Sequence, residues 1–227
     1  MTNWDDYGWL SYATVAEGDT FLLNDISETT VGNKMKLLNL KNAKIRFRGD
    51  LVLIGSTYYF EKILRAGENL KPTVTGGCAA VAQLEVGSSN KKVVDYLAFD
   101  ATTLEYAYAN IVLPAEYNGG TILCQYNWTH PATTTNFDVY FFFRAVATGD
   151  GESLDGTYGA AVGVLDTGGN TSFLYTSSLT EAITIGGTPI AGETMHFRLN
   201  RYPAGETNHL AVDAYLMSIR VLFPVTI

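Results

Sequence analysis

The 227-residue sequence has few charged residues, few cysteines and no long apolar run. Charged side chains make up only 17% of the chain and hydrophobic ones 47%, which excludes intrinsic disorder. No uncharged stretch is apolar enough over 18 residues to span a bilayer, and the start, Met1 to Asp6, lacks the basic and apolar regions of a secretory signal. Cys78 and Cys124 allow at most one bridge, and we expect them to be reduced, buried thiols. These absences predict a folded, soluble protein.

The sequence also lacks the short motifs of common catalytic sites. GxSxG, HExxH, GxxxxGK[ST] and GxGxxG are all absent. The histidines His130, His196 and His209 lie too far apart in sequence to form a short-spaced pair of metal ligands. The acidic loop Asp150 to Asp155 resembles a fragment of a calcium site, but the glycine and the terminal glutamate of an EF-hand loop are out of register. We therefore predict a protein that is not an enzyme and that has no cofactor or metal.

The residues that are abundant favour strands and turns. The chain has 22 glycines, 14 tyrosines and 11 phenylalanines, and aromatic and β-branched side chains suit a pleated, half-buried surface. From residue 93 onward, apolar runs alternate with turn residues at the spacing of a β-sandwich. The expected strands are 93–99, 104–113, 120–127, 137–147, 157–164, 171–176, 181–185, 193–201 and 210–223. The sequence therefore predicts an all-β, antiparallel sandwich.

Two of these segments have an informative alternation of side chains. In 194–199, Met195, Phe197 and Leu199 share one face and polar side chains the other, as in a sheet buried on one side. In 137–146 the odd positions are all apolar, and the even ones still include Tyr140 and Phe142. Both faces of that strand therefore need cover, from a loop or from a second subunit.

We predict three parts along the chain: a small β-rich attachment module over 1–45, a connecting β segment over 46–92 and the sandwich over 93–227. The module is expected to hold a hairpin around Glu17-Gly18-Asp19, followed by a strand or short helix at 35–40. In the connecting segment, 51–54 indicates a short strand, whereas 58–65 is compatible with one or two helical turns.

Charge divides the chain at the same place. Residues 1–92 carry 11 basic and 10 acidic side chains, whereas residues 93–227 carry 4 and 13. The formal net charge of −8 argues against a nucleic-acid partner. The basic segment 34–48 in the first part allows two interpretations. It is either a solvated strand face or a surface that docks on an acidic protein. The candidate docking residues are Lys34, Lys36, Lys44, Arg46 and Arg48.

Several further segments follow one another in a characteristic order. They are Gly76-Gly-Cys-Ala-Ala-Val-Ala-Gln-Leu-Glu85, Leu97-Ala-Phe-Asp-Ala-Thr-Thr-Leu-Glu-Tyr-Ala107, Asn118-Gly-Gly-Thr-Ile122, Ala145-Val-Ala-Thr-Gly-Asp-Gly151, Ala182-Ile-Thr-Ile-Gly-Gly-Thr-Pro189 and Leu210-Ala-Val-Asp-Ala-Tyr-Leu216. As a set they resemble a family of tailed-bacteriophage and prophage virion proteins. Residues 16–30, with Lys36 and Asn39-Leu40, resemble the short β module that opens many phage tail-fibre and appendage proteins.

The resemblance implies a non-enzymatic structural protein of the virion, with a sandwich of jelly-roll type. We expect an outer-surface head-decoration or cement protein, because 227 residues without a fibrous repeat favour a compact role. Its N-terminal region would attach to the major capsid protein or other virion proteins, and its acidic sandwich would face solvent. A homotrimer is expected, in a virion that is assembled in the host bacterial cytoplasm.

The alternative is a tail-fibre or receptor-binding protein whose sandwich binds a host surface glycan. Aromatic side chains in or beside loops can stack on a sugar ring. The candidates for glycan contact are Trp128 and Tyr202, for which packing at a buried edge is the competing interpretation.

Overall fold

The computed structural model describes residues 20–23, 36–39, 51–55, 57–132, 137–203 and 208–226. Every regular element in these ranges is a β-strand, so the predicted all-β class is confirmed. Within these ranges no helix has the length and apolar character needed to cross a bilayer. The chain divides into two compact units, Met1–Arg48 and Gly49–Ile227.

The first unit contains a small antiparallel sheet. Strand β1 (Thr20–Leu23) pairs with β2 (Lys36–Asn39), and the register runs from Thr20 opposite Asn39 to Leu23 opposite Lys36. The segment predicted as a strand or short helix at 35–40 is therefore a strand. The described residues of this unit are those of the two strands.

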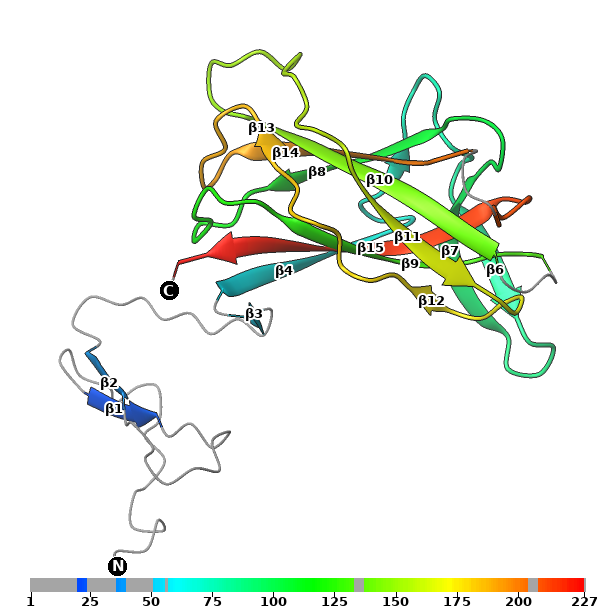
Figure 1. Cartoon of the computed structure of the whole chain (residues 1–227), viewed down its shortest axis with the longest axis horizontal. Helices are drawn as coiled ribbons and strands as arrows, with labels where there is room; N and C mark the ends of the chain where they lie inside the picture. The colour runs from blue at the N-terminus through cyan, green and yellow to red at the C-terminus, as the bar shows by residue number, and fades with distance from the viewer. Residues whose placement is uncertain are drawn as a thin grey trace, which may run out of the picture. The chain divides into compact units, whose positions relative to one another are not determined.

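The second unit is a β-sandwich of jelly-roll type, shown in Figure 1. The first layer, called the β10 sheet below, contains in order β11 (Val162–Gly168), β10 (Phe137–Thr148), β14 (Thr194–Arg201), β8 (Tyr106–Val112) and β5 (Lys71–Pro72), with β13 (Ile185–Gly186) beside β10. The second layer, called the β15 sheet, contains β12 (Tyr175–Thr176), β9 (Leu123–Thr129), β15 (Ala214–Val225), β4 (Thr57–Arg65) and β3 (Leu51–Ile54), with β7 (Lys92–Phe99) and β6 (Ala82–Val86) extending from β15. Among the strands named here, every pairing is antiparallel except that of β10 with β13.

The hydrophobic core fills the space between the two sheets. Phe141 of β10 packs edge to face against Phe99 of β7, with ring centroids 5.2 Å apart, and against Tyr126 of β9 at 4.9 Å. Met195, Phe197 and Leu199 are completely buried, so the predicted inward face of β14 is confirmed. Both cysteines are free and buried, as the sequence predicted.

Strand β10 uses its two faces differently. Phe137, Val139, Phe141 and Phe143 enter the core, whereas Tyr140 and Phe142 point outward and are partly exposed. Farther along the strand, a Cβ on Gly156 would lie 3.0 Å from Val146, so the loop after β10 covers the outer face at that end. The predicted cover is therefore a loop at Val146, while the two outward aromatic rings stay accessible.

The predicted connecting segment 46–92 contributes strands to the sandwich. From Leu51 onward it supplies β3, β4, β5 and β6, and the unit that contains the sandwich begins at Gly49 rather than at residue 93. The helical interpretation of 58–65 is wrong, because β4 pairs with β15 from Tyr58 opposite Val225 to Arg65 opposite Ser218. A long partner strand provides a full ladder of hydrogen bonds, which overrides a weak local preference.

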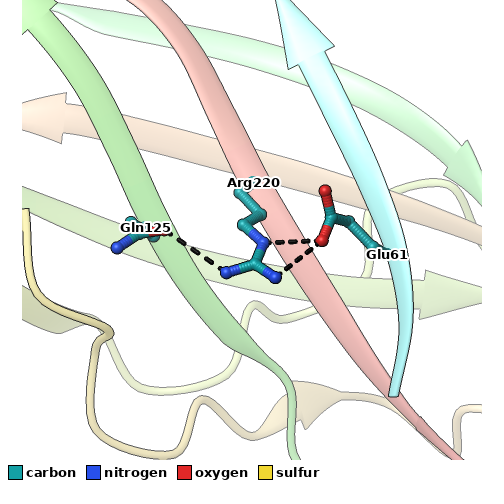
Figure 2. A network of polar contacts seen from close by, with 3 residues as sticks. All are labelled: Glu61, Gln125 and Arg220. Atoms are coloured by element: carbon teal, nitrogen blue, oxygen red, sulfur yellow. Dashed lines mark hydrogen bonds and ion pairs between the residues drawn. The ribbon is translucent and has the colours of Figure 1, made fainter. Parts of the chain in front are cut away.

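A polar network ties three strands together on the outer face of the β15 sheet, as Figure 2 shows. Arg220 of β15 contacts Oε2 of Glu61 on β4 through Nε and Nη2, each at 2.7 Å. Its Nη1 donates to Oε1 of Gln125 on β9 at 3.5 Å. The two charged side chains are about a quarter exposed, so this pair is shielded from solvent more than a surface ion pair.

A second arginine acts inside the core. Arg201, the last residue of β14, is 1% exposed and donates from Nη1 to the carbonyl oxygens of Phe99 at 3.0 Å and Val212 at 2.8 Å, while Nη2 donates to that of Leu210. Burial lowers the pKa of its guanidinium to about 10. The side chain remains a cation at neutral pH and joins β14 to the end of β7 and to the segment before β15.

Candidate functional site

The most distinctive surface is the outer face of the β10 sheet, called the β10 face below. It is formed by alternate, outward-pointing residues of three neighbouring strands and by the residue that follows β14. Its members include Asp138, Tyr140, Phe142 and Arg144 of β10, His196, Arg198 and the buried Asn200 of β14, Tyr106, Tyr108 and Asn110 of β8, and Tyr202. On all three strands the intervening residues are buried in the core.

Three aromatic rings form a cluster at one end of this face. The ring centroids of Tyr140 and Phe142 are 4.5 Å apart, and Tyr202 lies 5.8 Å from Phe142 and 6.4 Å from Tyr140. Tyr202 is 43% exposed, and its backbone N–H donates to the carbonyl oxygen of Tyr140 at 2.8 Å. That hydrogen bond positions the third ring beside the other two.

A glycine on the neighbouring strand determines how Tyr140 lies. Gly163 of β11 is the Cα partner of Phe142, and a Cβ built on it would be 2.5 and 2.6 Å from the ring atoms Cε2 and Cζ of Tyr140. The aromatic ring therefore lies across the position that a side chain would occupy. This packing holds the ring against the sheet with its other side toward solvent.

Polar and charged side chains continue the face beyond the rings. The guanidinium of Arg198 lies over the ring of Tyr106, 4.9 Å from its centroid, and over Tyr158 at 4.6 Å. His196 Nδ1 lies 3.0 Å from Oδ1 of Asn110. The face thus combines apolar ring surface with guanidinium and amide groups that can form hydrogen bonds.

An open hollow of about 570 Å³ lies where the face meets the loop after β10. Its lining includes His196, Thr148 and the carboxylates of Glu152 and Glu193. Each carboxylate accepts a backbone N–H at 2.9 Å, Glu152 from Gly149 and Glu193 from Ile190. In the described residues no three His, Cys, Asp or Glu side chains are grouped so that they could hold a metal ion.

The two aromatic residues predicted to contact a glycan have different surroundings. Trp128 is fully buried between the sheets, and its Nε1 donates to Oδ2 of Asp166 at 2.7 Å. Its proposed role in stacking on a sugar is therefore wrong, because its ring has no exposed surface. Burial raises the pKa of Asp166 although the Trp128 hydrogen bond opposes the shift. Tyr202, in contrast, is exposed and belongs to the β10 face.

The predicted docking residues fall almost entirely outside the described residues. Lys34, Lys44, Arg46 and Arg48 lie there, and Lys36 is described only as the first backbone position of β2. The docking role of these basic residues therefore remains a prediction from the sequence.

The main site residues that sequence reasoning missed are Tyr140, Phe142 and Arg198. Their alternation was visible, because Tyr140 and Phe142 occupy even positions of an otherwise inward strand and Arg198 lies on the polar face of β14. The pairing of β10 with β14 was not visible, and that pairing brings the three side chains onto one surface.

Comparisons with known proteins leave the chain without a family assignment. No family model matches it, and no curated protein matches it significantly. Among solved structures, the CBM22-2 xylan-binding domain from Paenibacillus barcinonensis Xyn10C is 11% identical, with a TM-score of 0.41 over 74% of this chain and 99% of that one.

Two larger proteins are similar over part of their length. A cycloisomaltooligosaccharide glucanotransferase from Paenibacillus sp. is 12% identical over 70% of this chain, with a TM-score of 0.38. The enzymatically active domain of bacteriophage CBA120 tailspike protein 4 is 11% identical over 72%, with a TM-score of 0.36. The chain spans 18% and 19% of those two chains. Similarity this weak identifies no activity, substrate or partner.

Proposed function

We propose that this protein is a non-enzymatic, carbohydrate-binding β-sandwich displayed on the surface of a tailed-phage particle, and that the β10 face holds the glycan. The observation that carries the proposal is the accessible cluster of Tyr140, Phe142 and Tyr202. Apolar ring surface that stays in contact with water is unfavourable, and a cluster of exposed rings therefore often marks a surface that a partner or ligand covers. A sugar ring offers an apolar face to stack on such rings and hydroxyl groups for the polar neighbours.

The polar part of the face supports the same proposal. Arg198, His196 and Asn110 provide hydrogen-bonding groups within the same sheet surface, next to the aromatic cluster. Ligand sites commonly combine aromatic side chains with a few fixed polar groups that set orientation. The rigid strands hold these side chains in place without a ligand.

Binding to a panel of bacterial surface polysaccharides tests the proposal. We expect saturable binding by the full chain, and Tyr202→Ala should weaken it about tenfold, the equivalent of about 1.4 kcal/mol. Phe173→Ala is the matched control, because Phe173 is 57% exposed and lies outside the β10 face. The absence of saturable binding across the panel would contradict the proposed function. Equal losses in the two variants would place the site elsewhere.

The particle setting is proposed from the sequence resemblance and is supported by the division of the chain after Arg48. A displayed protein needs one part that attaches and another that faces solvent, and a separate N-terminal unit suits attachment. Counting copies on purified particles distinguishes two positions. Hundreds of copies in the capsid lattice would indicate head decoration, whereas a few trimers at the tail would indicate a fibre. Reversing Lys44, Arg46 and Arg48 to glutamate should release the protein from particles.

A further inference from the structure

Two arginines occupy directly opposed positions on the β10 face. Arg144 of β10 and Arg198 of β14 are Cα partners in the antiparallel register. Residues opposed in this way have Cβ atoms about 4.5–5.5 Å apart, and like charges there destabilise the sheet. Neither arginine forms an ion pair with a described residue. The sheet therefore carries an uncompensated pair of positive charges at its surface.

The pair is unusual in this part of the chain. Residues 93–227 contain 13 acidic side chains and four arginines. The other two arginines have clear structural roles, since Arg201 is buried among carbonyl oxygens and Arg220 is paired with Glu61. Around Arg144 and Arg198, the outward neighbours in the register are Phe142, His196, Asn200, Tyr106, Tyr108 and Asn110, none of them acidic.

Arg198 is restrained by aromatic rings and not by an ion pair with a described residue. Its guanidinium lies over the rings of Tyr106 and Tyr158, and its Nε is buried without a hydrogen-bond partner among the described residues. Stacking on aromatic rings restrains a guanidinium without using its N–H donors. A restrained guanidinium that keeps its donors is prepared to bind an anion such as a carboxylate or sulfate.

We infer that the glycan bound at the β10 face is anionic, with a carboxylate or sulfate group that pairs with Arg144 and Arg198. This inference rests on the proposed function. Tyr140, Phe142 and Arg144 occupy every second position of β10, so each lies about 6.8 Å from the next along the strand. A saccharide lying along β10 meets two aromatic rings and then the arginine pair. A nucleic acid also carries anionic groups, so it is included in the test as the competing ligand.

The test compares acidic polysaccharides with their neutral counterparts. The probes are uronic-acid-containing and sulfated bacterial polysaccharides, each paired with its carboxyl-reduced or desulfated form, with oligo(dT) as a nucleic-acid probe. We expect the full chain to bind at least one acidic member about tenfold or more tightly than its neutral form, and added salt should reduce the difference. Arg144→Gln with Arg198→Gln should abolish the preference. Lys62→Gln with Lys92→Gln removes the same charge from two exposed sites elsewhere and should preserve it.

Each outcome supports or overturns a specific statement. If neutral forms bind as tightly as acidic ones and the arginine variant behaves like the wild type, the inference that the glycan is anionic is overturned. The proposed glycan site then stands. If no polysaccharide binds, both are overturned. Equal or tighter binding of oligo(dT) overturns the choice of a glycan. A thermal unfolding midpoint of the arginine variant at or above that of the wild type confirms that any loss reflects the missing charges, since removing opposed like charges relieves repulsion.

Discussion

The ring of Tyr140 lies across Gly163, so that a Cβ at residue 163 would be 2.5 Å from Cε2 of the tyrosine. The two residues belong to adjacent strands, β10 and β11, whose register places Gly163 opposite Phe142. The glycine is therefore part of the β10 face, because its lack of a side chain leaves the space that the Tyr140 ring occupies.

Gly163→Ala should displace this ring and weaken glycan binding to the level of Tyr140→Ala. Tyr140 is partly exposed and can swing outward, so the free energy of unfolding should fall by only about 1 kcal/mol. Binding titrations and urea unfolding check both effects. The double variant should bind no more weakly than Tyr140→Ala alone. Unchanged binding by Gly163→Ala would show that the ring position does not matter.

Much of this arrangement could be predicted from the sequence, for physical reasons. The period-two alternation in 194–199 and 137–146 identified which side chains face the core, because one face of each strand is buried. Local sequence does not specify which strands are neighbours. Phe142 and Arg198 come onto one surface only because β10 pairs with β14, a contact between segments about fifty residues apart.

The sequence predictions for residues 58–65 and for Trp128 are wrong because both depend on tertiary contacts that local sequence does not specify. Residues 58–65 contain a mixture of aromatic, charged and aliphatic side chains, and their strand conformation comes from the ladder with β15 at the far end of the chain. The position of Trp128 near a loop predicts a surface role, but its side chain is fully buried. Its burial depends on tertiary packing with Phe137 of β10 and Tyr175 of β12, whose ring centroids lie 6.1 and 5.1 Å from its own.

Arg201→Met should be strongly destabilising. The substitution leaves the carbonyl oxygens of Phe99 and Leu210 without this donor in the interior, and that of Val212 at a partly buried position; each buried unsatisfied group costs about 1–3 kcal/mol. We expect the free energy of unfolding to fall by about 3 kcal/mol or more, measured by urea titration. Arg201→Lys keeps the charge but cannot reach all three oxygens, so it should recover only part of the loss. A methionine variant as stable as the wild type would refute this role.

His130 should make stability depend on pH below neutrality. Its side chain is buried beside Trp128, Phe137 and Tyr175, and burial lowers its pKa from the ordinary 6.5. Below pH 6.5 the unfolded chain therefore binds a proton that the folded chain does not. The contribution of neutral His130 to the free energy of unfolding is fully present above pH 6.5. It is lost as the pH falls below that value, by at most about 1.4 kcal/mol per pH unit.

His130→Gln tests this directly, because glutamine does not titrate. Urea unfolding of both proteins between pH 8 and pH 5 should give a smaller loss of stability for the variant. The values at pH 8 provide the control, since the imidazole is neutral there in both the folded and unfolded states. Parallel curves for the two proteins would mean that other groups cause the pH dependence.

The Arg220–Glu61 pair should contribute a measurable coupling energy. Two nitrogens of Arg220 contact one oxygen of Glu61 at 2.7 Å, and both side chains are about a quarter exposed (Figure 2). We expect a double-mutant cycle with Glu61→Gln and Arg220→Met to give about 1 kcal/mol, at the upper end for exposed pairs. The coupling should shrink in high salt, because partly exposed charges are screened. A coupling near zero in low salt would mean that strand pairing alone holds β4 to β15, and that the ion pair only follows from it.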